Sequence, residues 1–129
     1  MPREIETYKT VMINNKFGNT QKSFNKSIYV EFIPDEIVLK FISAQDNNAN
    51  DEEGSYLLRT NLVEPFDLIS FPASSGYAES VDIPFRSTKP INSNYEFNLS
   101  KVDGGAIARL TTMNLSVSLT FLFIKFKSV

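Results

Sequence analysis

The stretch N-L-S-V-S-L-T-F-L-F-I-K-F-K, from Asn114 to Lys127, decides the fold of this chain. Its alternate positions carry large apolar side chains, namely Leu115, Val117, Leu119, Phe121 and Phe123. The opposite face begins with small polar side chains, namely Ser116, Ser118 and Thr120. Strict alternation with a period of two, rich in β-branched and aromatic residues, is typical of a half-buried β-strand. The stretch therefore predicts a long strand that belongs to a sandwich or barrel.

The second face of this predicted strand changes character toward its end. There the small polar residues give way to Leu122, Ile124 and Phe126. An apolar face of this size either buries against another element or forms an exposed patch. We expect these three residues to form a subunit contact. Lys125 and Lys127, which alternate with them, are typical of charged residues that protect an edge from unwanted strand pairing.

Shorter alternating runs precede the terminal stretch. They cover residues 4–13, 27–33, 36–43, 55–62, 67–71, 80–86, 94–99 and 107–112. Signals for turns, rich in Pro, Gly, Asn and Asp, separate the runs roughly every 8–12 residues, which is the spacing of an all-β sandwich or barrel. No convincing helical pattern and no internal repeat is visible. The sequence therefore predicts an all-β chain of eight or nine short strands.

Alternation also assigns faces within two of these runs. In residues 36–43 one face carries Ile37, Leu39 and Phe41, and the other carries Val38, Lys40 and Ile42. In residues 4–13 Val11 and Ile13 oppose Tyr8 and Met12. Side chains of a strand point alternately to its two sides, so each set is expected to share one environment.

Composition limits the functions that the chain can have. Its 129 residues fit one domain, and 42% hydrophobic and 22% charged residues are ordinary for a globular protein. A net charge of −2 argues against nucleic acid or an anionic membrane as the main partner. The first residues lack the pattern of a secretion signal, and no apolar stretch reaches membrane-spanning length. We therefore expect no nucleic-acid partner, no membrane insertion and no secretion.

The residues do not suggest a catalytic site. The chain contains no His, the commonest general base and metal ligand, and no Cys. The acidic loop at residues 46–53 carries Asp46, Asp51, Glu52 and Glu53, but their spacing is not that of a calcium-binding EF-hand loop. A solvated loop is the simpler interpretation. We expect a protein that is not an enzyme and that needs no metal or other cofactor.

Residues 14–26 are polar and carry three lysines with no acidic residue. We expect them to form a loop over the sandwich, or alternatively an arm that lies on a neighbouring subunit with Phe17 and Phe24 as its anchors. In this interpretation residues 1–26 are an N-terminal strand and basic arm, and residues 27–129 are the β-sandwich of a single domain. The opposite charge of the loop at 46–53 would suit such an arm.

A non-catalytic module that binds carbohydrate or another ligand is the alternative interpretation. Such a module presents exposed aromatic side chains on a flat face or on loops. Tyr56, Tyr77 and Tyr95 are the candidates, although the chain has no Trp, the favoured platform for a sugar ring.

The order of five segments carries a family resemblance. They are F-I-P-D (Phe32–Asp35), E-I-V-L-K-F-I-S (Glu36–Ser43), S-Y-L-L-R-T-N-L (Ser55–Leu62), N-Y-E-F-N-L (Asn94–Leu99) and S-V-S-L-T-F-L-F-I-K-F (Ser116–Phe126). In this order, over about residues 27–127, the chain resembles small single jelly-roll proteins of virus particles, in particular minor capsid and cement-type proteins of DNA viruses.

The resemblance implies a fold, a location and a set of partners. The fold is an eight-stranded antiparallel β-sandwich, the jelly roll, with two packed four-stranded sheets. The protein would be made in the host cytoplasm and built into the capsid of the virion. It would work through contacts with other copies of itself, as a homo-oligomer, and with other capsid proteins. The family has no catalytic residues and no cofactor to transfer.

Overall fold

A computed structural model of the chain describes residues 3–18, 20–46, 54–72, 76–86, 89–107 and 113–128. This part of the chain forms eight strands and no helix, so the prediction of an all-β protein is confirmed. The strands are β1 (Ile5–Gly18), β2 (Ser23–Tyr29), β3 (Glu36–Asp46), β4 (Ser55–Thr60), β5 (Phe66–Pro72), β6 (Gly76–Phe85), β7 (Asn92–Lys101) and β8 (Asn114–Phe126).

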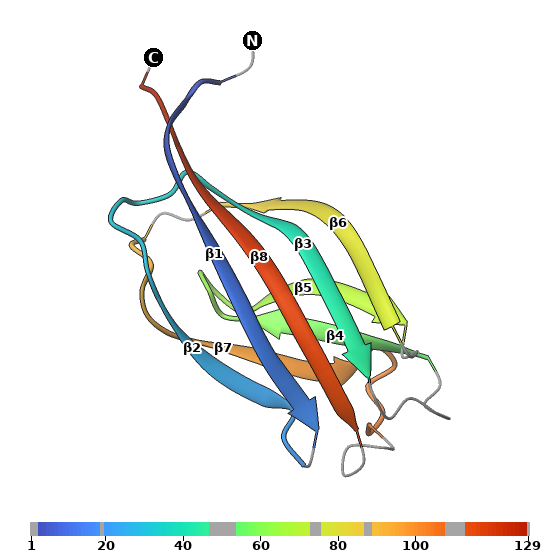
Figure 1. The fold of residues 1–129 in the computed structure, drawn as a ribbon. Helices are drawn as coiled ribbons and strands as arrows, with labels where there is room; N and C mark the ends of the chain where they lie inside the picture. Colours follow the sequence, from blue (N-terminus) through green and yellow to red (C-terminus); the bar gives the residue numbers. More distant parts are fainter. Residues whose placement is uncertain are drawn as a thin grey trace.

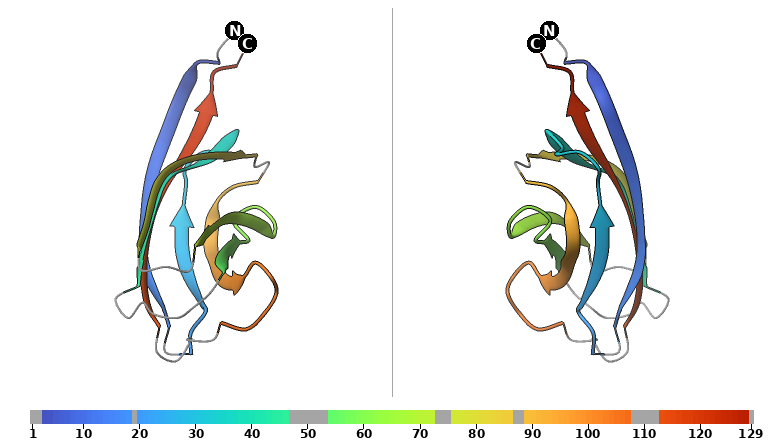
Figure 2. Two further views of the ribbon diagram at one scale, coloured as in Figure 1. Left: turned by 90° about the vertical axis from the view of Figure 1, so that its right-hand side faces the viewer. Right: turned by 90° about the vertical axis from the view of Figure 1, so that its left-hand side faces the viewer.

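The eight strands form two antiparallel sheets that face each other. One sheet has the order β1-β8-β3-β6 and the other has the order β2-β7-β4-β5. Figures 1 and 2 show them as two layers, and the ends of β1 and β8 extend beyond the second layer as a two-stranded ribbon. This arrangement is the jelly-roll β-sandwich that the resemblance implies. We call the first sheet the β8 sheet.

An aromatic ladder crosses the core between the two sheets. The ring centroids of Phe17 and Phe24 lie 5.2 Å apart, and those of Phe24 and Phe97 lie 5.1 Å apart. The ladder continues from Phe97 to Phe121 at 6.1 Å and from Phe121 to Phe123 at 6.3 Å. Offset or tilted aromatic pairs at such distances contribute about 0.5–1.5 kcal/mol beyond their area burial. The ladder joins β1 and β8 to β2 and β7, so it ties one sheet to the other.

The expected loop or arm over residues 14–26 is wrong for most of its length. β1 continues to Gly18 and pairs with β8 throughout, and β2 begins at Ser23 in the other sheet. The polar side chains of Asn14 and Lys16 are exposed, while Phe17 is buried. Pairing with a neighbouring strand and burial of one face outweigh the low β-propensity of Asn and Lys.

A register shift in β3 corrects the predicted face of Phe41. Ile37 and Leu39 are fully buried as expected, but the pairing of β3 with both neighbours shifts between Leu39 and Phe41. Such a β-bulge inserts one extra residue into the alternation. Lys40 and Phe41 are therefore both exposed, and Ile42 takes the next buried position. In β1 the predicted faces are confirmed, because Ile13 is buried and Tyr8 and Met12 are exposed.

Two expectations concern residues that the structure describes only in part. Of the acidic loop at 46–53, only the backbone of Asp46 is described, at the end of β3. Of the strand expected at 107–112, only Ile107 is described, and it lies outside any strand. The rest of both segments lies outside the described residues.

Gly18 provides a sharp test of how β1 and β8 approach each other. A Cβ at Gly18 would lie 1.9 Å from the Met113 carbonyl oxygen, and the residue has φ +130°. Gly104 also has a positive φ, +81°, but open space surrounds it. Gly104→Ala should cost about 1 kcal/mol for the left-handed backbone alone. Gly18→Ala should cost at least about 3 kcal/mol, because backbone must also move.

Urea unfolding of both variants beside the native chain measures this difference. Equal losses of unfolding free energy would contradict the close contact at Gly18.

Candidate subunit interface

The register of the β8 sheet arranges its outer face in rows that run across β1, β8 and β3. Three successive rows contain Tyr8, Ile124 and Glu36; Thr10, Leu122 and Val38; and Met12, Thr120 and Phe41. We call the set Tyr8, Met12, Val38, Phe41, Leu122 and Ile124 the apolar half of this face. The next two rows contain only polar side chains on these strands: Asn14, Ser118 and Ser43, then Lys16, Ser116 and Gln45. We call them the polar half.

The apolar half combines buried and exposed side chains. Val38 and Ile124 are only 3% and 7% exposed, although neither belongs to the core cluster between the sheets. Tyr8 and Met12 are each 63% exposed, and Phe41 is 38% exposed. Exposed patches of large apolar side chains are typical of association sites, so this face is the candidate interface.

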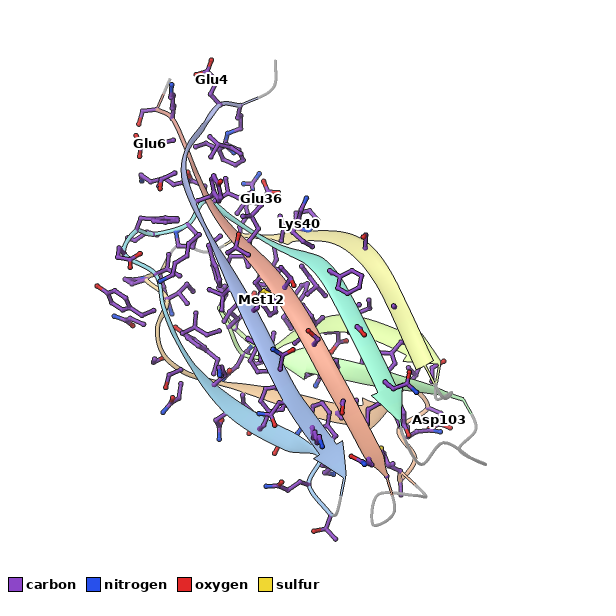
Figure 3. The ribbon with its side chains drawn as sticks, in the orientation of Figure 1. Glu4, Glu6, Met12, Glu36, Lys40 and Asp103 are labelled. Atoms are coloured by element: carbon purple, nitrogen blue, oxygen red, sulfur yellow. The ribbon has the colours of Figure 1, made fainter. Side chains whose placement is uncertain are left out.

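Two opposite charges lie on β3 beside the apolar side chains. Glu36 is half-buried at the start of the strand, and Lys40 is exposed in the bulge. Figure 3 shows Glu36 and Lys40 along the first part of β3, with Met12 on β1. Leu39 and Ile42 point into the core, so the two exposed residues between them, Lys40 and Phe41, lie on the outer face.

Several contacts hold the end of β8 in place. The backbone N–H of Asp35 donates to the Ile124 carbonyl oxygen at 2.8 Å, and Asp35 Oδ2 accepts a hydrogen bond from the Phe126 N–H at 2.9 Å. The Arg3 guanidinium lies 4.2 Å from the centre of the Phe126 ring, within the range of a cation–π contact. The Lys127 N–H donates to the Glu4 carbonyl at 2.8 Å. These contacts hold the last residues of β8 in place, and with them the end of the apolar half that contains Ile124.

A charged contact also holds β1 beside the end of β2. Lys9 Nζ donates to the Tyr29 carbonyl oxygen at 2.6 Å and lies 3.4 Å from Glu31 Oε1. A hydrogen bond from the backbone of Glu31 and the nearby Lys9 charge lower the pKa of the exposed Glu31 carboxyl. Because the folded-state pKa is lowered, the ionised form of Glu31 favours the fold at neutral pH, and that small contribution disappears as the pH falls below the ordinary pKa.

The five residues predicted to contact a neighbour lie in three places. Leu122 and Ile124 lie together in the apolar half, and Phe126 is half-buried farther along the ribbon. Phe17 is fully buried and Phe24 packs against the core, so both rings already have partners inside the chain. Whether any of the five contacts a neighbour stays a prediction.

The sequence did not identify three exposed residues of this face, Tyr8, Met12 and Phe41, as interface candidates. Tyr8 and Met12 were assigned to the side of their strand opposite Val11 and Ile13, which is the signal that could have identified them. Phe41 reaches the outer face only because of the bulge, and nothing in the alternation of residues 36–43 indicates a bulge.

The tyrosines proposed as a sugar platform are mostly unavailable. Tyr56 is fully buried, and its hydroxyl lies 3.4 Å from the Met113 sulfur. Tyr95 is buried, and its hydroxyl accepts a hydrogen bond from the Asn92 N–H at 2.9 Å. The side chain of Tyr77 is outside the described residues. Neither buried ring can stack on a sugar without a change in the fold.

The described residues also offer little for other kinds of site. In this part of the chain, no three His, Cys, Asp or Glu side chains gather where they could hold a metal ion. Among the same residues, no helix is long and apolar enough to cross a membrane.

The chain resembles known proteins in its fold but not in its sequence. No protein-family model and no curated protein sequence matches the chain. Among solved structures, the chain is similar to the Drosophila NLP-core, described for its pentamer formation and histone binding, with a TM-score of 0.50, 12% identity, and coverage of 92% of this chain and 100% of that one. At this identity the likeness concerns the fold alone.

Two further structures are similar at lower scores. The nucleoplasmin-like N-terminal domain of Drosophila FKBP39 has a TM-score of 0.40 and 11% identity, over 93% of this chain and 94% of that one. The VP2 subviral particle of infectious bursal disease virus has a TM-score of 0.47 and 12% identity, over 93% of this chain and 34% of that one. The neighbours thus include nucleoplasmin-like domains and viral capsid proteins.

Ile124→Asp tests whether the buried residues of the apolar half support the fold. A carboxylate at this nearly inaccessible position should lower the free energy of unfolding by about 2–4 kcal/mol. Thr10→Asp, at an exposed position in the adjacent row, should change it by no more than about 0.5 kcal/mol. Denaturant unfolding checks both values. A stable Ile124→Asp domain would show that Ile124 is not held as tightly as the structure places it.

Proposed function

We propose that this protein is a structural, non-catalytic subunit that associates with other copies of itself, and that the assembly is a viral capsid shell. The observation that carries the proposal is the apolar half of the β8 sheet, where Tyr8, Met12 and Phe41 expose large apolar side chains on the same sheet face, around Leu122 and Ile124. Covering such a surface with another protein surface is favourable, because it removes apolar area from water.

The capsid assignment rests on two further supports. The order of segments from Phe32 to Phe126 resembles small jelly-roll proteins of virus particles. The strand order of the two sheets is that of a jelly roll, a fold that occurs in viral capsid proteins. Fold alone does not give function, so the resemblance of the segments is needed as well. On this proposal the protein resides in the virion and also contacts other capsid proteins.

The proposal gives the chain no chemistry of its own. A chain without His or Cys lacks the groups that most often act as general base or nucleophile at neutral pH. The carbohydrate-binding alternative is less well supported, since Tyr56 and Tyr95 are buried. Binding to a glycan array would revive that alternative, and we expect none.

The mass of the purified protein in solution tests the proposal directly. We expect sedimentation velocity and native mass spectrometry to show an association that grows with protein concentration, and electron microscopy to show closed or lattice-like particles when other shell components are present. A mass of five subunits would instead indicate a pentamer, the assembly described for the NLP-core. A chain that stays monomeric at every concentration, and that binds no shell component, would contradict the proposal.

A further inference from the structure

The occupant of the apolar half can be inferred from the charges beside it. Rows on a sheet face are separated by about 6.7 Å along the strands. Glu36 lies in the first of the three rows, Leu122 in the middle row, and Lys40 in the bulge beside the third row. The two opposite charges are therefore placed symmetrically about the middle row on a single strand.

We propose that two copies of this chain pair face to face through the apolar half. A two-fold axis relates the two copies; it lies between the two faces, runs perpendicular to the strands, and passes over the middle row. This inference rests on the proposed self-association and specifies its geometry. The axis exchanges the first and third rows and leaves each strand opposite its own copy. It therefore places Glu36 opposite Lys40 of the second copy, and the symmetry makes this ion pair twice.

The apolar side chains also match under this operation. Leu122 meets Leu122 of the second copy at the axis. Tyr8 meets Met12 of the second copy, a pairing of an aromatic ring with a thioether that is favourable in its own right. β8 crosses its copy in the antiparallel sense, and face-to-face sheets commonly pack with strands within about 30° of each other.

A second two-fold axis is conceivable, and the charges disfavour it. An axis that runs along β8 would place β1 opposite β3 of the second copy. Glu36 would then lie opposite Tyr8, beside the exposed Glu6, and Lys40 would lie opposite Met12. Neither charge would gain an oppositely charged partner. The axis across the strands is therefore the better arrangement.

The size of the face indicates a weak pair. Three strands about 4.8 Å apart and three rows give a footprint of roughly 300 Å². A standard stable interface buries about 800 Å² on each partner. We therefore expect dimerisation in about the micromolar range or weaker, which sets the concentrations at which it must be measured.

Charge reversal provides the decisive experiment. Glu36→Lys should weaken dimerisation of the full chain about fivefold or more, because the reversal places two lysines opposite each other at both sites. Lys40→Glu should do the same with two carboxylates. An equimolar mixture of the two variants should recover the native dissociation constant, because each charge then meets its opposite in the mixed dimer. Sedimentation equilibrium measures all four samples, with circular dichroism to confirm that each variant is folded.

Met12→Glu and Gln45→Glu form a matched pair that separates this inference from the proposed function. Both introduce one negative charge on the same sheet face, but Gln45 lies in the polar half. Met12→Glu should weaken dimerisation at least about tenfold, as expected when a carboxylate replaces an apolar side chain that the pairing buries, and Gln45→Glu should leave it unchanged.

Different failures have different meanings. If Met12→Glu dissociates the dimer but the mixture of charge variants stays weak, the two-fold axis across the strands is overturned. If Met12→Glu associates as the native chain does, the apolar half is not the contact, while self-association stands. If the native chain itself never associates, the proposed function falls.

Discussion

The pairing of β8 on both of its sides is the constraint on which the rest of this structure depends. β8 is hydrogen-bonded to β1 along one edge and to β3 along the other over nearly its whole length. A slip of one residue would exchange every inward side chain for an outward one. Phe121 and Phe123 would then leave the core, and the serines would enter it. The two strand pairings of β8 thus fix both the aromatic core and the change from polar to apolar side chains on the outer face.

The aromatic ladder and the outer face are two consequences of the same register. Phe121 and Phe123 reach inward to the ladder that ends at Phe17, while Leu122 and Ile124 between and beyond them face outward. A substitution of an inward residue, Phe121 or Phe123, is therefore expected to disturb the position of the outward residues Leu122 and Ile124 as well. The hydrogen bonds of Asp35 to Ile124 and Phe126 extend this control to the last residues of β8, where the second sheet no longer covers the strand.

The sequence predicted this fold where the period of two was unbroken. The terminal strand, the faces of Tyr8 and Met12, and the buried positions of Ile37 and Leu39 all follow from alternation. The prediction failed over residues 14–26 because local propensity could not reveal that Asn14 and Lys16 lie on the solvent face of a paired strand. It failed again at Phe41, because a bulge adds one residue to the alternation and no residue type in this segment indicates a bulge.

The candidate site was accordingly predictable in part. Leu122 and Ile124 were identified because they interrupt a polar face with large apolar residues. Phe17 and Phe24 were predicted as anchors on a neighbour because their segment looked like a loop; the structure buries Phe17 in the core and packs Phe24 against it, and their contact with a neighbour stays a prediction. The exposed members of the apolar half, Tyr8, Met12 and Phe41, come from β1 and β3, which are far apart in the sequence, and only the register of the sheet with β8 brings them onto one face.

The division of one sheet face into two halves fits the proposed role of a subunit that folds before it assembles. Val38 and Ile124 are already buried within the monomer, so only part of the apolar half remains exposed to unwanted contacts. A footprint of roughly 300 Å² holds two copies together only weakly. Weak contacts add up when each subunit has several neighbours, since the second contact forms at a high effective concentration. On the proposed self-association, a face of this size favours an ordered multi-subunit assembly over an isolated tight dimer, and it would let misplaced subunits dissociate while the assembly grows.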